Sequence, residues 1–179
     1  MNSLSPDDAA RSLSEIEKVE ARSGRALGYQ FAAPHFFLWG VVWMLGYGLS
    51  DLRPGWSKFA WPILILAALV TIVLLPRPAK RGGWRAAVLL LVLLGFVAAT
   101  FAVLGPVSDR QQAAFIPLIV AAIQIWAGLY AGLRYALAGA IVAALTLGGY
   151  FLLREHFLLW MALVGGGGLI LTGIWFRRV

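Results

Sequence analysis

Long uninterrupted runs of apolar residues alternate with short polar segments along this chain. Each run lacks the single apolar stripe of a soluble helix, and each is close to the roughly 20 residues that a helix needs to cross a bilayer. The pattern predicts an all-α integral membrane protein with six transmembrane helices, preceded by a short cytoplasmic amphipathic helix. The predicted spans are about 34–50, 59–76, 85–104, 113–132, 135–153 and 157–176.

Composition supports a membrane protein and narrows the chemistry. Hydrophobic residues make up 61% of the chain and charged residues 13%, which is too apolar for an ordinary soluble domain. The net charge of +7 does not indicate nucleic acid, because the cations collect beside the predicted spans. The absence of cysteine excludes disulfides and thiolate metal sites, and the two histidines, His35 and His156, are predicted a full membrane apart. We therefore expect no metal and no cofactor.

A basic hinge between the second and third predicted spans sets the orientation. Because Lys and Arg are retained on the cytoplasmic side of short loops, Arg77, Lys80, Arg81 and Arg85 predict that this hinge lies inside. Six spans then place both termini in the cytoplasm. The cations left outside are Arg53, Lys58, Arg110 and Arg154. A bias toward Ala, Leu, Arg and Gly with few Lys suggests a bacterial inner (plasma) membrane.

The N-terminal residues differ from the rest of the chain because they are polar. Ser5 and Asp8 form a capping-box pattern that predicts a helix start, and Gly24 is a predicted stop. Residues 1–28 are thus expected to form a cytoplasmic helix and linker, and residues 29–179 the membrane domain. Five acids offset four cations in this segment, which argues against binding of anionic lipid. Two interpretations remain open, namely a solvated lead-in helix and a dock, through residues 5–24, for a membrane or cytoplasmic protein partner.

Three features inside the predicted spans are candidates for ligand binding. Trp39, Trp43 and Tyr47 recur every four residues and share one helix face. This face either lines a pocket or makes packing or lipid contacts. Gln124 is the most polar side chain at mid-span, so its amide needs a partner on a neighbouring helix or in a cavity. The run 165–168 is four glycines. Either the helix is unwound there, with Gly166 and Gly167 lining a polar cavity, or another helix packs on it.

Small residues in the spans predict close helix packing. Gly128 and Gly132 form a small-xxx-small pattern, and Gly165 and Gly168 belong to the glycine run. Such patterns bring backbones together without saying whether the partner is another helix of this chain or a second copy. The pattern leaves a homo-oligomer open.

No catalytic constellation is recognisable in the sequence. None of the predicted spans holds a charged residue except Arg85, at the hinge end of its span, and neither a nucleophile elbow nor a phosphate-binding glycine loop is present. We expect a non-enzymatic protein, with no catalytic residues, that lies in the lipid bilayer as an accessory, regulatory or scaffolding subunit. The alternative is a small uncoupled transporter or channel for an apolar or lipid-like ligand.

Overall fold

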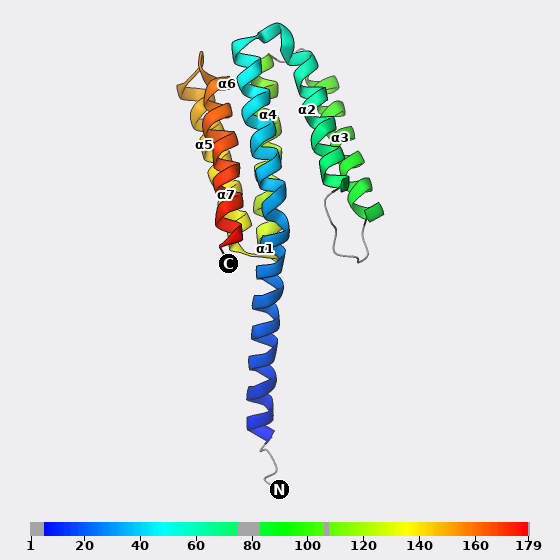
Figure 1. The fold of residues 1–179 in the computed structure, drawn as a ribbon, viewed down its shortest axis with the longest axis vertical. Helices are drawn as coiled ribbons and strands as arrows, with labels where there is room; N and C mark the ends of the chain where they lie inside the picture. The colour runs from blue at the N-terminus through cyan, green and yellow to red at the C-terminus, as the bar shows by residue number, and fades with distance from the viewer. Residues whose placement is uncertain (1–5, 75–82, 106–107, 179) are drawn as a thin grey trace.

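The chain folds into helices that run side by side (Figure 1). The computed structural model describes residues 6–74, 83–105 and 108–178, and every element in that part of the chain is helical. The elements are α1 (Pro6–Leu52), the 3₁₀ turn η1 (Pro54–Trp56), α2 (Ser57–Leu74), α3 (Gly83–Leu104), α4 (Asp109–Ala131), α5 (Leu133–Leu152), α6 (Phe157–Trp160), the π-helical η2 (Met161–Gly166) and α7 (Gly167–Arg177).

The helices have the length and apolar character that the hydropathy pattern predicts. Five stretches of the described residues are long and apolar enough to cross a membrane, and a shorter apolar stretch, Leu91–Leu104, lies in α3. The all-α fold class is therefore confirmed. The five stretches are Ala10–Leu52, Pro54–Thr71, Asp109–Ala131, Leu133–Leu152 and Phe157–Arg177.

The first helix corrects the prediction of a separate N-terminal helix and linker. α1 is one continuous helix of 47 residues that passes through Gly24, and Pro34 lies inside it rather than in its first turn. A glycine ends a helix when its backbone turns left-handed, which among the described residues happens only at Gly105 and Gly132. Gly24 keeps helical backbone geometry, and the Arg-Ala-Leu segment after it favours helix. The stop expected at Gly24 is therefore wrong.

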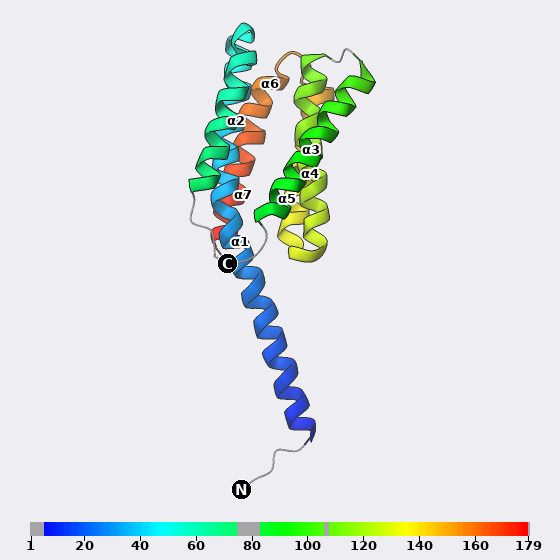
Figure 2. The same ribbon diagram turned by 90° about the vertical axis from the view of Figure 1, so that its right-hand side faces the viewer.

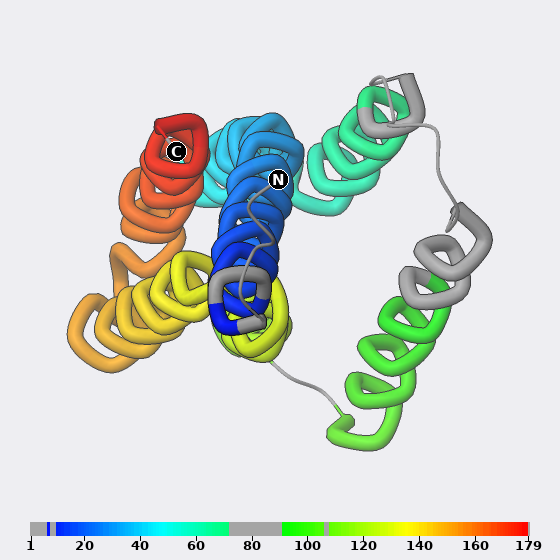
Figure 3. Tube along the Cα trace, turned by 90° about the horizontal axis from the view of Figure 1, so that it is seen from below, coloured from blue at the N-terminus to red at the C-terminus, as the bar shows by residue number. Residues whose placement is uncertain are grey.

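α1 is the central element of the bundle. Seen from below, it lies between α2 on one side and the α6–η2–α7 segment on the other, while α4 and α5 form a neighbouring pair (Figure 3). α3 stands apart from α5 and α7, and the rings of Phe101 and Phe115, 5.2 Å apart, join it to α4. The buried core lies mainly where α1 meets α7, η2 and the α4–α5 pair.

The first part of α1 leaves the bundle (Figures 1 and 2). We call residues 6–28 the α1 extension; nearly all of its described side chains are exposed, and burial begins at Tyr29. The extension departs at the end of the bundle where α7 finishes and α4 turns into α5, which we call the C-terminal end. At a rise of 1.5 Å per residue the extension is about 35 Å long.

Candidate functional site

The aromatic stripe of α1 is part of the packed core. Trp43 and Tyr47 are buried, with their rings 6.0 Å apart, and Tyr47 also contacts the ring of Trp61 in α2 at 4.9 Å. The Tyr47 hydroxyl donates a hydrogen bond to the backbone oxygen of Ala113 at 2.9 Å, which ties α1 to α4. Trp39 is half-buried against the same core. These side chains pack helices against one another. Packing is one of the two roles that the sequence allowed for them, the other being to line a pocket.

Gln124 is buried between α4 and α5 with its carbonyl oxygen unsatisfied. The side chain is 9% exposed, and a Cβ on Gly139 of α5 would lie 2.9 Å from the Gln124 Cβ. Its Oε1 accepts no hydrogen bond from any described group. A buried polar group without a partner costs about 1–3 kcal/mol. The amide therefore faces a neighbouring helix, one of the two surroundings that the sequence allowed.

The glycine run is helical and divides into two pairs with different surroundings. Gly165 lies beside Met161 and Trp43, and a Cβ on Gly166 would lie 2.8 Å from backbone atoms of Gly40 and Met44 in α1. Beyond this point the helix changes from the π-helical η2 to α7. The unwound alternative is not what the described backbone shows.

The second pair of glycines has open space around it. A Cβ on Gly167 or on Gly168 would meet no atom within 4 Å. Gly168, predicted as a packing position, therefore makes no close helix contact through its side-chain position within the described residues. Gly167, a candidate ligand residue, lies in the same open surroundings.

The glycines of α4 do pack closely. A Cβ on Gly128 would lie 2.5 Å from the Cβ of Ala136, so the α4 and α5 backbones approach one another there. Gly132 is the single residue between the two helices, at φ +119°, a conformation that L side chains rarely adopt. The phenol oxygen of Tyr29 occupies the place that a Gly132 side chain would take. The chain therefore turns back at the boundary between the predicted spans 113–132 and 135–153.

An aromatic cluster closes the C-terminal end of the bundle. Phe176 of α7 is fully buried, and the rings of Tyr29, Phe36 and Tyr135 each lie 4.9 Å from it. The Tyr135 hydroxyl also donates to the backbone oxygen of Gly28 at 3.4 Å. The cluster therefore joins α1, α5 and α7 and fixes where the α1 extension leaves them.

Arginine side chains lie on these aromatic rings. The guanidinium of Arg134 lies 5.5 Å from the Tyr29 ring and 5.0 Å from the Trp175 ring, and it donates to the Trp175 backbone oxygen at 2.9 Å. Arg177 lies 5.4 Å from the ring of Phe37. The bundle thus presents cations at the level of its aromatic residues, which is the arrangement expected at a membrane interface.

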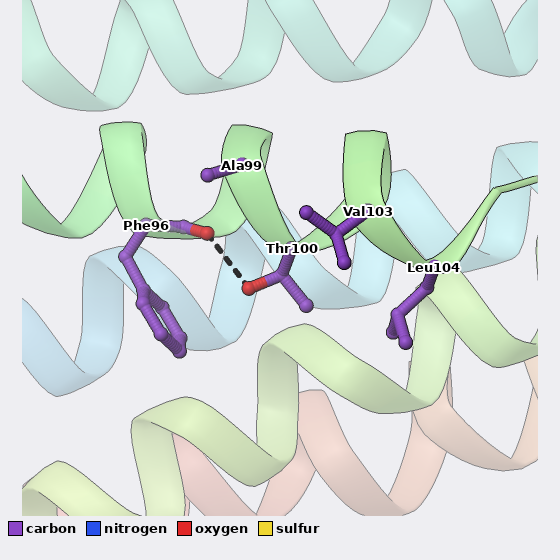
Figure 4. Close-up of a pocket in the computed structure, with 5 residues that line it drawn as sticks. All are labelled: Phe96, Ala99, Thr100, Val103 and Leu104. Atoms are coloured by element: carbon purple, nitrogen blue, oxygen red, sulfur yellow. Dashed lines mark hydrogen bonds between the residues drawn. The ribbon is translucent and has the colours of Figure 1, made fainter.

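The structure contains a groove that the sequence did not suggest. It is an open, shallow hollow of about 280 Å³ on α3, lined by Phe96, Ala99, Thr100, Val103 and Leu104 (Figure 4). The Thr100 hydroxyl donates to the backbone oxygen of Phe96 at 2.8 Å, so the groove presents apolar surface. Gln124, the aromatic stripe and the glycine run contribute nothing to it.

The basic hinge is the part of the prediction that the structure does not address. Arg77, Lys80 and Arg81 lie outside the described residues, and so does the side chain of Arg85. Their role in orientation stays a prediction.

The arginine–aromatic cluster at the C-terminal end was missed in the sequence. Each member sits near the end of an apolar run, where interfacial aromatic and basic residues are common, and that was the available signal. Sequence spacing cannot predict that Tyr29, Tyr135 and Phe176 contact one another, because these residues are far apart in the chain. No family model, curated protein or solved structure matches this chain.

Proposed function

We propose that this protein is a non-catalytic, six-span subunit of a bacterial inner membrane that binds a cytoplasmic protein through the α1 extension. In this proposal both termini, the extension and the C-terminal end of the bundle lie on the cytoplasmic side, as the distribution of Lys and Arg predicts. Its role is that of an accessory or regulatory component. The exposed apolar side of the α1 extension is the observation that carries the proposal.

That apolar side is a stripe along the helix. Leu13, Ile16 and Leu27 are 62%, 55% and 53% exposed. Their spacings of three and eleven residues bring them back to one side of the helix at 3.6 residues per turn. We call these three residues the apolar stripe. Large apolar side chains aligned on a water-facing helix indicate a surface that another molecule covers.

The bilayer does not cover the Leu13 and Ile16 part of this stripe in the proposed orientation. The extension is continuous with the part of α1 that packs in the bundle, so it leaves along the direction of that helix instead of lying flat (Figures 1 and 2). Leu13 is 16 residues before Tyr29, where burial in the bundle begins, which is about 24 Å along a helix. In this orientation Leu13 and Ile16 therefore lie in the aqueous phase, where a helix of a partner protein fits them, and Leu27 lies beside the end of the bundle.

A second copy of the chain suits the stripe less well than a different protein does. Glu20 lies one turn after Ile16 on the same side of the helix. In a parallel pair of identical extensions, two Glu20 carboxylates would face one another, and like charges at such a position are unfavourable. A partner with a basic residue opposite Glu20 removes that cost. The proposal therefore names a heterologous protein.

The test compares two double variants of the full-length chain, purified in mild detergent from its own host. Leu13→Glu with Ile16→Glu places two carboxylates on the stripe. Ser14→Glu with Ala21→Glu adds the same charge on another side of the helix, away from the stripe, and is the matched control. Mass spectrometry of each eluate measures the ratio of any co-purifying protein to this chain. We expect a stoichiometric partner with the unaltered chain and the control, and its loss with the stripe variant.

Two outcomes would contradict the proposal. A partner retained equally by both variants would place its binding site elsewhere on the molecule. No stoichiometric protein with any of the three, together with a defined apolar molecule bound to all of them, would favour the uncoupled transporter or channel for a lipid-like ligand instead.

A further inference from the structure

We propose that the C-terminal end of the bundle binds the headgroup of an anionic phospholipid between Arg25 of α1 and Arg134 of α5. Arg22, one turn before Arg25, extends the site toward the water phase. The inference rests on the membrane placement in the proposed function but not on the protein partner. It assigns a ligand class to the arginine–aromatic cluster.

Both arginines lie near Tyr29, whose phenol contacts Gly132. The Cδ of Arg25 lies 3.5 Å from the point that a Cβ on Gly132 would occupy, and the Tyr29 phenol fills that same point. Arg134, two residues after Gly132, has its guanidinium over the ring of Tyr29. Arg25 and Arg134 therefore both lie close to one tyrosine, at the turn from α4 to α5.

The direction of the α1 side chains also favours this site. Arg22 and Arg25 precede Tyr29 by seven and four residues, so all three lie on the same side of α1. Tyr29 is on the side of α1 that packs into the bundle. The extension leans beneath the α4–α5 turn in two perpendicular views (Figures 2 and 3), which keeps this basic side near the end of the bundle.

No carboxylate neutralises these cations in the part of the chain that the structure describes. The five acids of the extension all precede residue 21, and the next acid along α1 is Asp51, at its opposite end. The Arg134 guanidinium gives one hydrogen bond to a backbone oxygen, and its remaining N–H groups are available. The overall charge of the N-terminal segment, which argued against anionic lipid, therefore hides a purely cationic portion next to the bundle.

A phospholipid fits this cluster better than a soluble acidic partner does. Guanidinium groups match the oxygens of a phosphate in paired hydrogen bonds. The site lies at the ends of apolar helices and among the rings of Tyr29, Tyr135 and Trp175, which is the level of lipid headgroups in the proposed orientation. A bilayer lipid reaches this level without leaving the membrane.

The test measures lipid binding to the purified full-length chain by native mass spectrometry. Phosphatidylglycerol is titrated against phosphatidylcholine with the same acyl chains. The variants are Arg25→Gln alone, Arg25→Gln with Arg134→Gln, and the matched control Arg53→Gln with Arg154→Gln, which removes two arginines from the opposite end. Arg25 is exposed, so its substitution leaves the aromatic packing intact even if the double variant folds poorly.

We expect the apparent Kd for phosphatidylglycerol to rise about fivefold for Arg25→Gln and roughly thirtyfold for the double variant, the effect of one and two basic side chains near an anionic headgroup. The control should bind as the unaltered chain does. Equal weakening in the control, or equal binding of both lipids, would overturn the proposal.

Two further arms separate this ligand from others. Inorganic phosphate added at constant ionic strength should leave the lipid bound; full displacement by phosphate would indicate a soluble phosphate compound instead. The apolar-stripe variant should keep its lipid, so loss of the protein partner and loss of the lipid are distinguishable. Unchanged lipid binding by the double variant, with loss of a co-purifying acidic protein, would assign the cluster to that protein and overturn the lipid site.

Discussion

Gly40 of α1 and Gly166 at the end of η2 face one another at backbone distance. A Cβ on either residue would lie 2.8 Å from the backbone oxygen of the other. The contact is reciprocal, and the atoms involved are main-chain atoms that cannot swing aside. It holds the last membrane-length helix against the central one, and it makes two glycines 126 positions apart in the chain depend on each other.

Gly166→Ala should destabilise the protein, whereas Gly167→Ala should not. The added methyl at Gly166 meets the α1 backbone and forces a shift, at a cost of about 1–3 kcal/mol. At Gly167 the same methyl enters open space, and alanine also favours helix by about 1 kcal/mol. The stability of each variant is measured by thermal unfolding in detergent and by its abundance in the membrane. An equal loss of stability in the two variants would show that Gly166 and Gly167 do not differ in how closely they pack.

Trp160→Phe should remove one hydrogen bond while keeping an aromatic ring in place. The Trp160 Nε1 donates to the backbone oxygen of Leu145 in α5 at 2.9 Å, and its ring fills the space above Gly149. We expect a loss of about 1 kcal/mol in the free energy of unfolding. Trp126→Phe is the control, because Trp126 is exposed. A melting temperature lowered as much by the control would contradict this account.

Gln124→Leu should stabilise the chain. Leucine has a similar volume and removes a buried carbonyl oxygen that lacks a partner, so the free energy of unfolding should rise by about 1 kcal/mol or more. The melting temperature of the purified protein in detergent reports the change. A clear decrease instead would mean that the amide has a partner when the protein is in its membrane, and would direct attention to a ligand between α4 and α5.

The orientation can be tested with single cysteines, since the chain has none of its own. Gln112→Cys lies exposed near the start of α4, and Ser23→Cys lies exposed on the α1 extension at the other end of the bundle. A membrane-impermeant maleimide should label Gln112→Cys in intact cells and Ser23→Cys only after lysis. The reverse pattern would invert the orientation and place the extension outside.

Several properties of this protein follow from its sequence by local rules. Backbone groups in lipid must be hydrogen-bonded within the segment, so a long apolar run such as 113–132 is expected to be helical. The helix α4 covers nearly all of this run. The turn between the predicted spans 113–132 and 135–153 follows from the length of the apolar run around Arg134, which is too long for one crossing. These rules need only the neighbouring residues, which is why they worked.

Other properties were decided by tertiary structure. Gly24 is helical because nothing in its surroundings requires a left-handed backbone, and α1 is anchored beyond it by Tyr29 on Phe176. Gly166 packs while Gly167 does not, although the two have the same side chain, because only one faces α1. Arg25 and Arg134 both lie beside Tyr29 because three helices converge on one aromatic cluster. Which faces of apolar helices touch depends on shape complementarity between distant segments, and hydropathy carries no information about shape.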